Sequence, residues 1–143
     1  MKRLTIIYWS ATGNTELMAS AIAEGAKNAG AEVNILPVAA ASAEDALSAD
    51  LLALGCPAMG AEVLEESEFE PFFAGLESSL SGKKVALFGS YDWGDGQWMR
   101  DWQDRVVAAG AVLYNNEGLI VNNTPDEDGL KECRDFGAGF AAL

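Results

Sequence analysis

The sequence predicts an open, doubly wound α/β domain, in which a parallel sheet carries helices on both faces. Short apolar runs alternate with amphipathic stretches along the 143 residues, which gives five strand–helix units in succession. The cores of three runs, LTIIYW, DLLALGC and KKVALFGS, are almost continuously apolar, as in strands that are covered on both faces. We see no repeat or linker, so a single domain is expected over residues 1–143.

The expected strands and helices follow one another in strict alternation. The strands are expected at residues 3–9, 32–37, 50–56, 83–90 and 111–121, the last of them interrupted by NNEG. The helices are expected at residues 15–29, in a short stretch after 42, from about 70, at 97–109, and from 127 to the C-terminus. Ligands of such sheets bind beyond the carboxyl ends of the strands. The loops after the first, third, fourth and fifth strands are therefore the candidate site.

Several of these helices carry recognisable signals at their ends. Gly30 and Gly110 are well placed to end the first and the fourth helix. Ser42, with Asp45 three residues later, approximates a capping box, and Pro71 stands where the first turn of a helix tolerates proline. Apolar residues at helical spacing form the stripes of the last two helices: Trp98 or Met99, Trp102 and Val106, then Cys133, Phe136, Gly137 and Phe140.

The charge of the chain excludes some classes of partner. Nine basic residues stand against twenty-two acidic ones, for a formal net charge of −13. A nucleic acid or an anionic membrane surface would be repelled, because both bind mainly through basic groups. A basic protein partner would be attracted and steered. The alternative is that the acidity only keeps the protein soluble, and the total charge does not separate the two.

Several catalytic and metal chemistries are also excluded. The chain has no histidine, so serine–histidine and cysteine–histidine catalysis are ruled out and a zinc site is not expected. Cys56 and Cys133 are read as buried small hydrophobes rather than as a disulfide framework. No apolar stretch approaches the ~20 residues of a membrane helix, and the start MKRLTIIYW lacks a signal-peptide pattern. We expect a soluble, cytoplasmic protein.

The turn SATGNT joins the first strand to the first helix. The start of a helix offers free backbone N–H groups and the positive end of the helix dipole to a phosphate. Ser10, Thr12, Asn14 and Thr15 add side-chain donors, and Gly13 allows close backbone approach. The turn lacks both the lysine of a nucleoside-triphosphate loop and the G-x-G-x-x-G of a dinucleotide fold. It predicts one terminal monophosphate bound by neutral donors, although a bare turn and helix cap would also account for it.

The loop after the third strand, CPAMGAEVLEESEFEP, is acidic. Glu62, Glu65, Glu66 and Glu68 place four carboxylates in seven residues. Their spacing does not match the calcium-binding pattern D-x-[DN]-x-[DN]-G. We therefore expect solvated acids rather than a cation site.

The loop after the fourth strand, GSYDWGDGQW, combines three glycines with aromatic residues. Glycines let backbone N–H groups approach a ligand closely, and Tyr91 or Trp93 is able to lie flat against a planar ring. The alternative is that Trp93 packs on its neighbours, but it belongs to no helical stripe. A ligand with a phosphate, a polyol chain and a flat heterocycle would fill all three loops, which points to flavin mononucleotide (FMN).

With these loops the sequence closely resembles the flavodoxins, specifically the short-chain kind of anaerobic bacteria. The resemblance runs nearly end to end. YWSATGNTE is similar to the family's phosphate loop, AMGAEVLEESEFEPF and KKVALFGSYDWGDGQWMRDW to its two flavin loops, and LIVNNTPDE to a late segment on the ribityl side. It implies the flavodoxin-like fold: a five-stranded parallel sheet of order 2-1-3-4-5 in a three-layer α/β/α sandwich.

The resemblance also implies roles for individual positions. Met59 would lie on the inner flavin face and Trp93 on the outer. Gly60 would carry the peptide that flips on reduction, so that its carbonyl accepts a hydrogen bond from flavin N5–H, and Glu62 would hold N3–H. Trp9 would lend backbone or packing to the phosphate site. The full implied set is Ser10, Ala11, Thr12, Gly13, Asn14, Thr15, Pro57, Ala58, Met59, Gly60, Ala61, Glu62, Ser90, Tyr91, Asp92, Trp93, Gly94, Gly96, Trp98 and Asn123.

Two positions depart from the family pattern. Ala61 stands where a polar residue often follows the flipping glycine, and Asp92 where glycine often precedes the stacking tryptophan. Alanine changes the preference of the turn, because residues that tolerate φ > 0 ease a type II turn. The Asp92 carboxylate adds charge near the pyrimidine edge. Both affect how strongly the semiquinone is stabilised.

We therefore expect a low-potential one-electron carrier, and not an enzyme, that shuttles between the neutral semiquinone and the anionic hydroquinone of bound FMN. Glu62, Glu65, Glu66 and Asp95, with the phosphate and no close cation, would oppose the charge of the hydroquinone. The expected partners are redox proteins with basic docking surfaces, and the expected state is a monomer.

Two other functions use similar topology. One is an FMN-dependent NAD(P)H or quinone reductase of the same fold, although the chain is too short for an added nicotinamide or quinone subdomain. The other is a regulatory receiver domain. That class needs an acidic pocket after the first strand and an aspartate after the third, where this chain has SATGNT and CPAMG.

Overall fold

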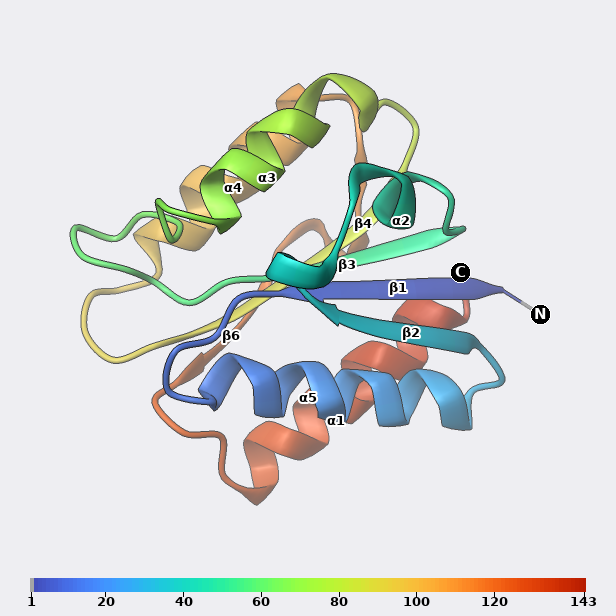
Figure 1. Ribbon diagram of the computed structural model, residues 1–143. Helices are drawn as coiled ribbons and strands as arrows, with labels where there is room; N and C mark the ends of the chain where they lie inside the picture. The colour runs from blue at the N-terminus through green and yellow to red at the C-terminus, as the bar shows by residue number, and fades with distance from the viewer. Residues whose placement is uncertain (1) are drawn as a thin grey trace.

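A computed structural model of the chain describes residues 2–143 and has three layers, with a parallel sheet between two layers of helices (Figure 1). The strands follow the order β2-β1-β3-β4-β5, and β6 also pairs with β4. This order confirms the expected fold class. The strands are β1 (Arg3–Tyr8), β2 (Glu32–Pro37), β3 (Leu51–Gly55), β4 (Lys84–Tyr91), β5 (Val112–Leu113) and β6 (Leu119–Asn122).

The central strands are those with the most continuous apolar sequence. All five residues of β3 are buried, and β3 lies between β1 and β4 with Leu4 opposite Leu51 and Leu51 opposite Lys84. The edge strand β2 instead alternates exposed and half-buried residues. A strand with helices on both faces and neighbours on both sides has no exposed position, which explains its lack of polar residues.

The fifth predicted strand, 111–121, divides into two short strands at NNEG. Val112 pairs with Lys84, and Leu119 pairs further along the same strand with Phe88, so β5 and β6 occupy one edge of β4 in succession. Between them Asn115 has a φ of 62° and Asn116 a φ of 60°. These left-handed conformations, which asparagine tolerates better than most residues, break the run. The predicted interruption at NNEG is therefore confirmed, and the residues on its two sides form separate strands.

The helices begin and end close to their predicted limits. They are α1 (Asn14–Asn28), α2 (Ala43–Leu47), α3 (Phe69–Leu76), α4 (Gln97–Ala108) and α5 (Glu127–Ala141). The capping box at α2 is present: the Ser42 side chain accepts from the amide of Asp45, and the Asp45 carboxylate accepts from the amide of Ser42. Gly30 and Gly110 follow α1 and α4 with φ values of 95° and 87°, as glycine stop signals require.

The two faces of the sheet carry separate cores. On one face α1 and α5 pack side by side and enclose Met18, Ile22 and Phe140 (Figure 1). On the other face α3 and α4 cover the sheet, and Trp102 packs edge-on against Phe69 with ring centroids 5.4 Å apart. The loops at the carboxyl ends of β1, β3 and β4 gather at one end of the molecule, opposite the start of β1 and the end of α5.

The structure gives two further facts about the described part of the chain. No helix within residues 2–143 has both the length and the apolar character that a bilayer span requires. In the same range, no group of three or more histidine, cysteine or acidic side chains is arranged to hold a metal ion.

Candidate functional site

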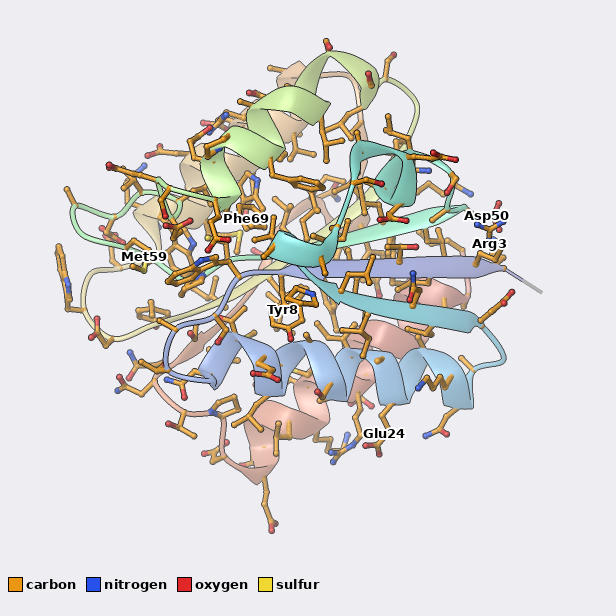
Figure 2. The ribbon with its side chains drawn as sticks, viewed as in Figure 1. Arg3, Tyr8, Glu24, Asp50, Met59 and Phe69 are labelled. Carbon is orange, nitrogen blue, oxygen red and sulfur yellow. The ribbon has the colours of Figure 1, made fainter. Side chains whose placement is uncertain are left out.

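A cavity of about 240 Å³ lies where the loops after β1, β3 and β4 meet. Its lining comes from all three loops and from the segment after β6: Trp9, Ser10, Ala11, Thr12, Asn14, Thr15, Pro57, Ala58, Met59, Ser90, Tyr91, Asp92 and Asn123. Figure 2 shows Met59 at this end of the molecule and Arg3 and Asp50 at the other. No lysine or arginine lines the cavity, so an anion bound there would be held by neutral donors.

The turn after β1 is folded around the hydroxyl of Ser10. Its Oγ accepts from the amide of Gly13 at 3.1 Å and from the amide of Glu16 at 3.3 Å. Gly13 has a φ of 94°, and a Cβ added there would meet nothing within 4 Å, so glycine is required for its conformation and not for space. The turn thus places the start of α1, where helix N–H groups lack partners within the helix, beside the cavity that Asn14 and Thr15 line.

Two side chains of this turn are held by distant segments. The Thr124 hydroxyl donates to Asn14 Oδ1 at 2.9 Å, which leaves the amide nitrogen of Asn14 free to donate into the cavity. Thr15 is buried, and its Oγ1 lies 3.0 Å from the Oγ of Ser90, while the Ser90 amide donates to Thr15 Oγ1 at 3.4 Å. These bonds join the turn after β1 to the end of β4 and to the segment after β6.

The loop after β3 forms a small hairpin. Met59 and Val63 exchange two backbone hydrogen bonds, of 2.9 and 3.0 Å. Gly60 and Glu62 between them have φ values of 49° and 56°, in the left-handed region, with Ala61 between the two. A Cβ on Gly60 would meet nothing within 4 Å, so its cost would be conformational. The hairpin presents Met59 to the cavity and leaves Gly60 exposed at its tip.

The carboxylate of Glu62 lies on the first turn of α4. Its Oε1 accepts from the amide of Gln97 at 3.0 Å, and a Cβ on Gly94 would lie 2.6 Å from the carboxylate. Glu62 therefore ties the hairpin to the start of α4. The φ of 88° favours glycine at 94, and a Cβ there would displace the end of the Glu62 side chain. Its implied role toward flavin N3–H stays a prediction.

In the loop after β4, the two aromatic residues have different surroundings. Tyr91 is half-buried, lines the cavity, and has its ring centroid 5.7 Å from that of Trp98. Trp93 is 59% exposed, so more than half of its surface is open to solvent. An indole projecting from a glycine loop at the edge of the cavity is free to cover a planar ring.

Several of the predicted site residues do not line the cavity. Trp98 is buried beneath it, where its Nε1 donates to the carbonyl of Cys56 at 3.1 Å, so it supports the floor. Trp9, which was expected to lend backbone or packing to the phosphate site, is part of the lining. The others outside the lining are Gly13, Gly60, Ala61, Glu62, Trp93, Gly94 and Gly96, all of them in the turns that surround it.

One expectation about charge was wrong: Glu65 is not solvated but buried, at 6% exposure. The structure also pairs Asp95 with a cation, since Arg100 Nη2, on the first turn of α4, lies 2.9 Å from the Asp95 Oδ1. The cysteines behave as expected: burial raises the pKa of both the Cys56 and the Cys133 thiol to about 12, so neither is a nucleophile.

The site residues fit FMN. The cavity offers a helix N-terminus with hydroxyl and amide donors for a phosphate, the segment at Asn123 for a polyol, and Met59, Tyr91 and Trp93 for a flat ring. The absence of basic side chains from the lining is compatible with a phosphate because backbone N–H groups and the helix dipole supply the positive potential.

Comparison with known proteins gives a consistent result. The family model described as flavodoxin matches residues 6–137. The flavodoxin of Clostridium beijerinckii is 51% identical over 140 residues, covering 98% of this chain and 100% of the relative. That of Megasphaera elsdenii is 47% identical over 136 residues, covering 95% and 96%. The solution structure of two-electron reduced Megasphaera elsdenii flavodoxin superposes with a TM-score of 0.88 at 45% identity, over 98% of this chain and 99% of that one.

Proposed function

The chain belongs to the flavodoxin family of FMN-binding electron carriers, and we propose that it works as a low-potential carrier that passes between the neutral semiquinone and the anionic hydroquinone of its cofactor. The close relatives are named as carriers and not as enzymes, so a reductase activity is not favoured. A receiver domain is excluded by the family.

One observation carries the proposal: three loops from β1, β3 and β4 converge on a single cavity that has neutral phosphate donors at one side and aromatic residues at the other. FMN supplies one-electron redox chemistry when it is bound. The chain's own residues bind and orient it. In this proposal Ser10, Thr12 and Asn14 hold the phosphate, while Met59 and Trp93 cover the two faces of the ring.

Gly60 is proposed to strengthen binding of the protonated states. A carbonyl turned toward the flavin accepts a hydrogen bond only when N5 carries a proton. One such bond contributes roughly 0.5–1.5 kcal/mol. The open space around Gly60 and its exposure at the hairpin tip leave its peptide room to turn. This preference for N5-protonated forms separates the two one-electron steps.

The acidic surroundings are proposed to lower the potential of the second step. Asp92 lines the cavity and Glu66 is exposed on the neighbouring loop. A carboxylate about 10 Å from the flavin raises the free energy of its anion by ~1–2 kcal/mol at an effective dielectric constant of 20. Asp95 contributes less than its sequence suggested, because Arg100 pairs with it.

Flavodoxins function with redox protein partners, and we propose that those of this chain present basic docking surfaces. The net charge of −13 supports this proposal, because it would steer a basic partner electrostatically. We propose a single-domain monomer, since the exposed large apolar side chains, such as Leu17, Val107 and Val112, are scattered.

Titration of the apoprotein with FMN tests the proposal directly. We expect tight binding with quenched flavin fluorescence, and weaker binding of riboflavin, which lacks the phosphate. Stepwise reduction should then accumulate the one-electron-reduced flavin and reveal two separate potentials. Equal affinity for riboflavin would contradict the phosphate role of the turn after β1, and a single two-electron step would contradict the carrier mechanism.

A further inference from the structure

Glu65 is the one acidic residue of the loop after β3 that is buried. Its Oε1 accepts from the amides of Glu68 at 2.7 Å and of Phe69 at 2.9 Å. Its Oε2 accepts from the amide of Ser67 at 2.9 Å and from the Ser67 hydroxyl. The carboxylate therefore meets four donors at the start of α3, where free N–H groups and the helix dipole favour a negative charge.

The backbone of Glu65 is tied to the sheet as well. Its amide donates to the Sγ of Cys56, the residue after β3, at 3.4 Å, and its carbonyl accepts from the amide of Glu70 at 2.8 Å. Glu65 also lies only two residues beyond Val63, which closes the hairpin with Met59. One residue thus connects β3, the hairpin and α3.

The charge state of Glu65 suits this arrangement. Burial alone would raise the pKa of the carboxyl, but the hydrogen bonds from Ser67, Phe69 and Glu68 outweigh it and lower the pKa to about 2. The group is therefore ionised near neutral pH. Its neighbour Glu66 provides a contrast, because it is exposed and no hydrogen bond or ion pair of its side chain is found among residues 2–143.

We propose that Glu65 is a positioning residue for the cofactor site: its carboxylate holds the base of the Met59–Val63 hairpin against α3 and thereby fixes where Met59 and Gly60 lie. Glu65 is not in the cavity lining. The inference rests on the proposed function, which gives Met59 and Gly60 their places against the ring. The sequence suggested that Glu65 acts through its negative charge on the flavin, whereas this inference assigns it a structural role.

The test compares Glu65→Gln with Glu66→Gln. Both variants remove one formal charge from adjacent positions, but only the first disturbs the anchor. Glutamine offers one acceptor oxygen in place of two. With its NH2 group beside Ser67, the hydrogen bonds from the Ser67 amide and hydroxyl would be lost, because an NH2 group cannot accept them. Glu65→Asp keeps the carboxylate on a shorter side chain and serves as the conservative variant.

We would measure the dissociation constant for FMN and the fraction of one-electron-reduced flavin at half reduction. Glu65→Gln is expected to weaken FMN binding on the order of tenfold, the effect of losing a charge-assisted hydrogen bond. It should also lower the one-electron-reduced fraction more than Glu66→Gln does. Glu66→Gln should stay within about twofold of the wild type in affinity, and Glu65→Asp should recover part of both effects.

Three results would overturn the inference. If Glu65→Gln and Glu66→Gln had the same FMN affinity and the same one-electron-reduced fraction, Glu65 would act only through its charge. If Glu65→Gln were less stable in urea but kept the wild-type FMN affinity and the wild-type one-electron-reduced fraction, Glu65 would act only as a cap of α3. Wild-type protein that fails to bind FMN would overturn the proposed function and this inference together. If Glu65→Gln does not fold, Ser67→Ala removes only the hydroxyl donor and should shift both measurements in the same direction by less; no shift would count against the anchor.

Discussion

Replacing Gly137 with alanine should force apart the two helices that cover one face of the sheet. A Cβ at this position of α5 would lie 2.0 Å from the carbonyl oxygen of Ile22 in α1 and 2.8 Å from its carbonyl carbon. The opposing glycine is equally close: a Cβ on Gly25 would lie 1.9 Å from the carbonyl oxygen of Arg134. Because the atoms approached belong to helix backbones, no side-chain rotation relieves the contact.

The cost follows from two opposing effects. Alanine is favoured over glycine inside a helix by ~1 kcal/mol. Overpacking of a well-packed contact costs about 1–3 kcal/mol, and backbone atoms place this case at the upper end. Gly75 in α3 is the matched control, since an added Cβ there meets nothing within 4 Å. Gly75→Ala should therefore gain ~1 kcal/mol, while Gly137→Ala should lose ~1–2 kcal/mol.

The assay is urea unfolding of the two apoproteins beside the wild type. A change in the midpoint at constant slope reports the change in the free energy of unfolding. The difference between the two variants isolates packing, because the gain in helix propensity is common to both. If Gly137→Ala were as stable as Gly75→Ala, α1 and α5 would not approach as closely as described, and the packing that places the start of α1 at the cavity would need revision.

Three further predictions concern the site. Gly60→Ala should lower the fraction of one-electron-reduced flavin at half reduction, because a Cβ restricts the backbone of residue 60 and should hinder its peptide from turning toward the flavin. An unchanged fraction in a redox titration would contradict the role of this peptide. Electron transfer to a basic c-type cytochrome, followed by stopped flow, should slow as ionic strength rises, because salt screens the net charge of −13. A rate constant that does not change with ionic strength would contradict electrostatic steering. The folded-state pKa of Glu65 is lowered to about 2, so its carboxylate stabilises the fold fully above the unfolded pKa of ~4.3, and this contribution is lost as pH falls from about 5 to 2. The urea midpoint should therefore fall less across this range in Glu65→Gln than in the wild type. Parallel curves would contradict the low pKa of Glu65.

The sequence predicted the layers of the fold well because the apolar pattern reports burial directly. The run DLLALGC has no polar residue within the strand because β3 is covered on all sides. The same pattern does not report local backbone conformation. NNEG predicted an interruption within residues 111–121, but not the positive φ values of Asn115 and Asn116, through which the chain forms two short strands there.

The site was predictable to the extent that it depends on loops of unusual composition. SATGNT and GSYDWGDGQW both border the cavity, as a helix N-terminus and a glycine-rich turn would suggest. The sequence does not reveal which hydrogen-bond partner each side chain has. The Thr124 hydroxyl holds Asn14 across a separation of 110 residues, and Thr15 meets Ser90 across 75. Such pairs depend on strand order and register, which local patterns leave open.

The acids of the loop after β3 show the same limit in a functional setting. As sequence they are one cluster of like charges, but three of them accept hydrogen bonds from different elements. Glu62 accepts from the amide of Gln97 in α4, Glu65 from the start of α3, and Glu68 from the indole Nε1 of Trp9 at 3.2 Å. Only Glu66 remains without such a bond among the described residues.

This division changes the source of the electrostatic effect on the flavin. A carboxylate that accepts from helix N–H groups has part of its field compensated by those donors and by the helix dipole. In the proposed function, Glu62 and Glu65 therefore serve mainly to hold the loops around the cavity in place. Repulsion of the reduced flavin would then depend more on Asp92 and Glu66, whose side chains accept no such hydrogen bond among residues 2–143. Asp92 is the one acidic residue in the cavity lining, so we expect Asp92→Asn to raise the potential of the second step more than Glu65→Gln does.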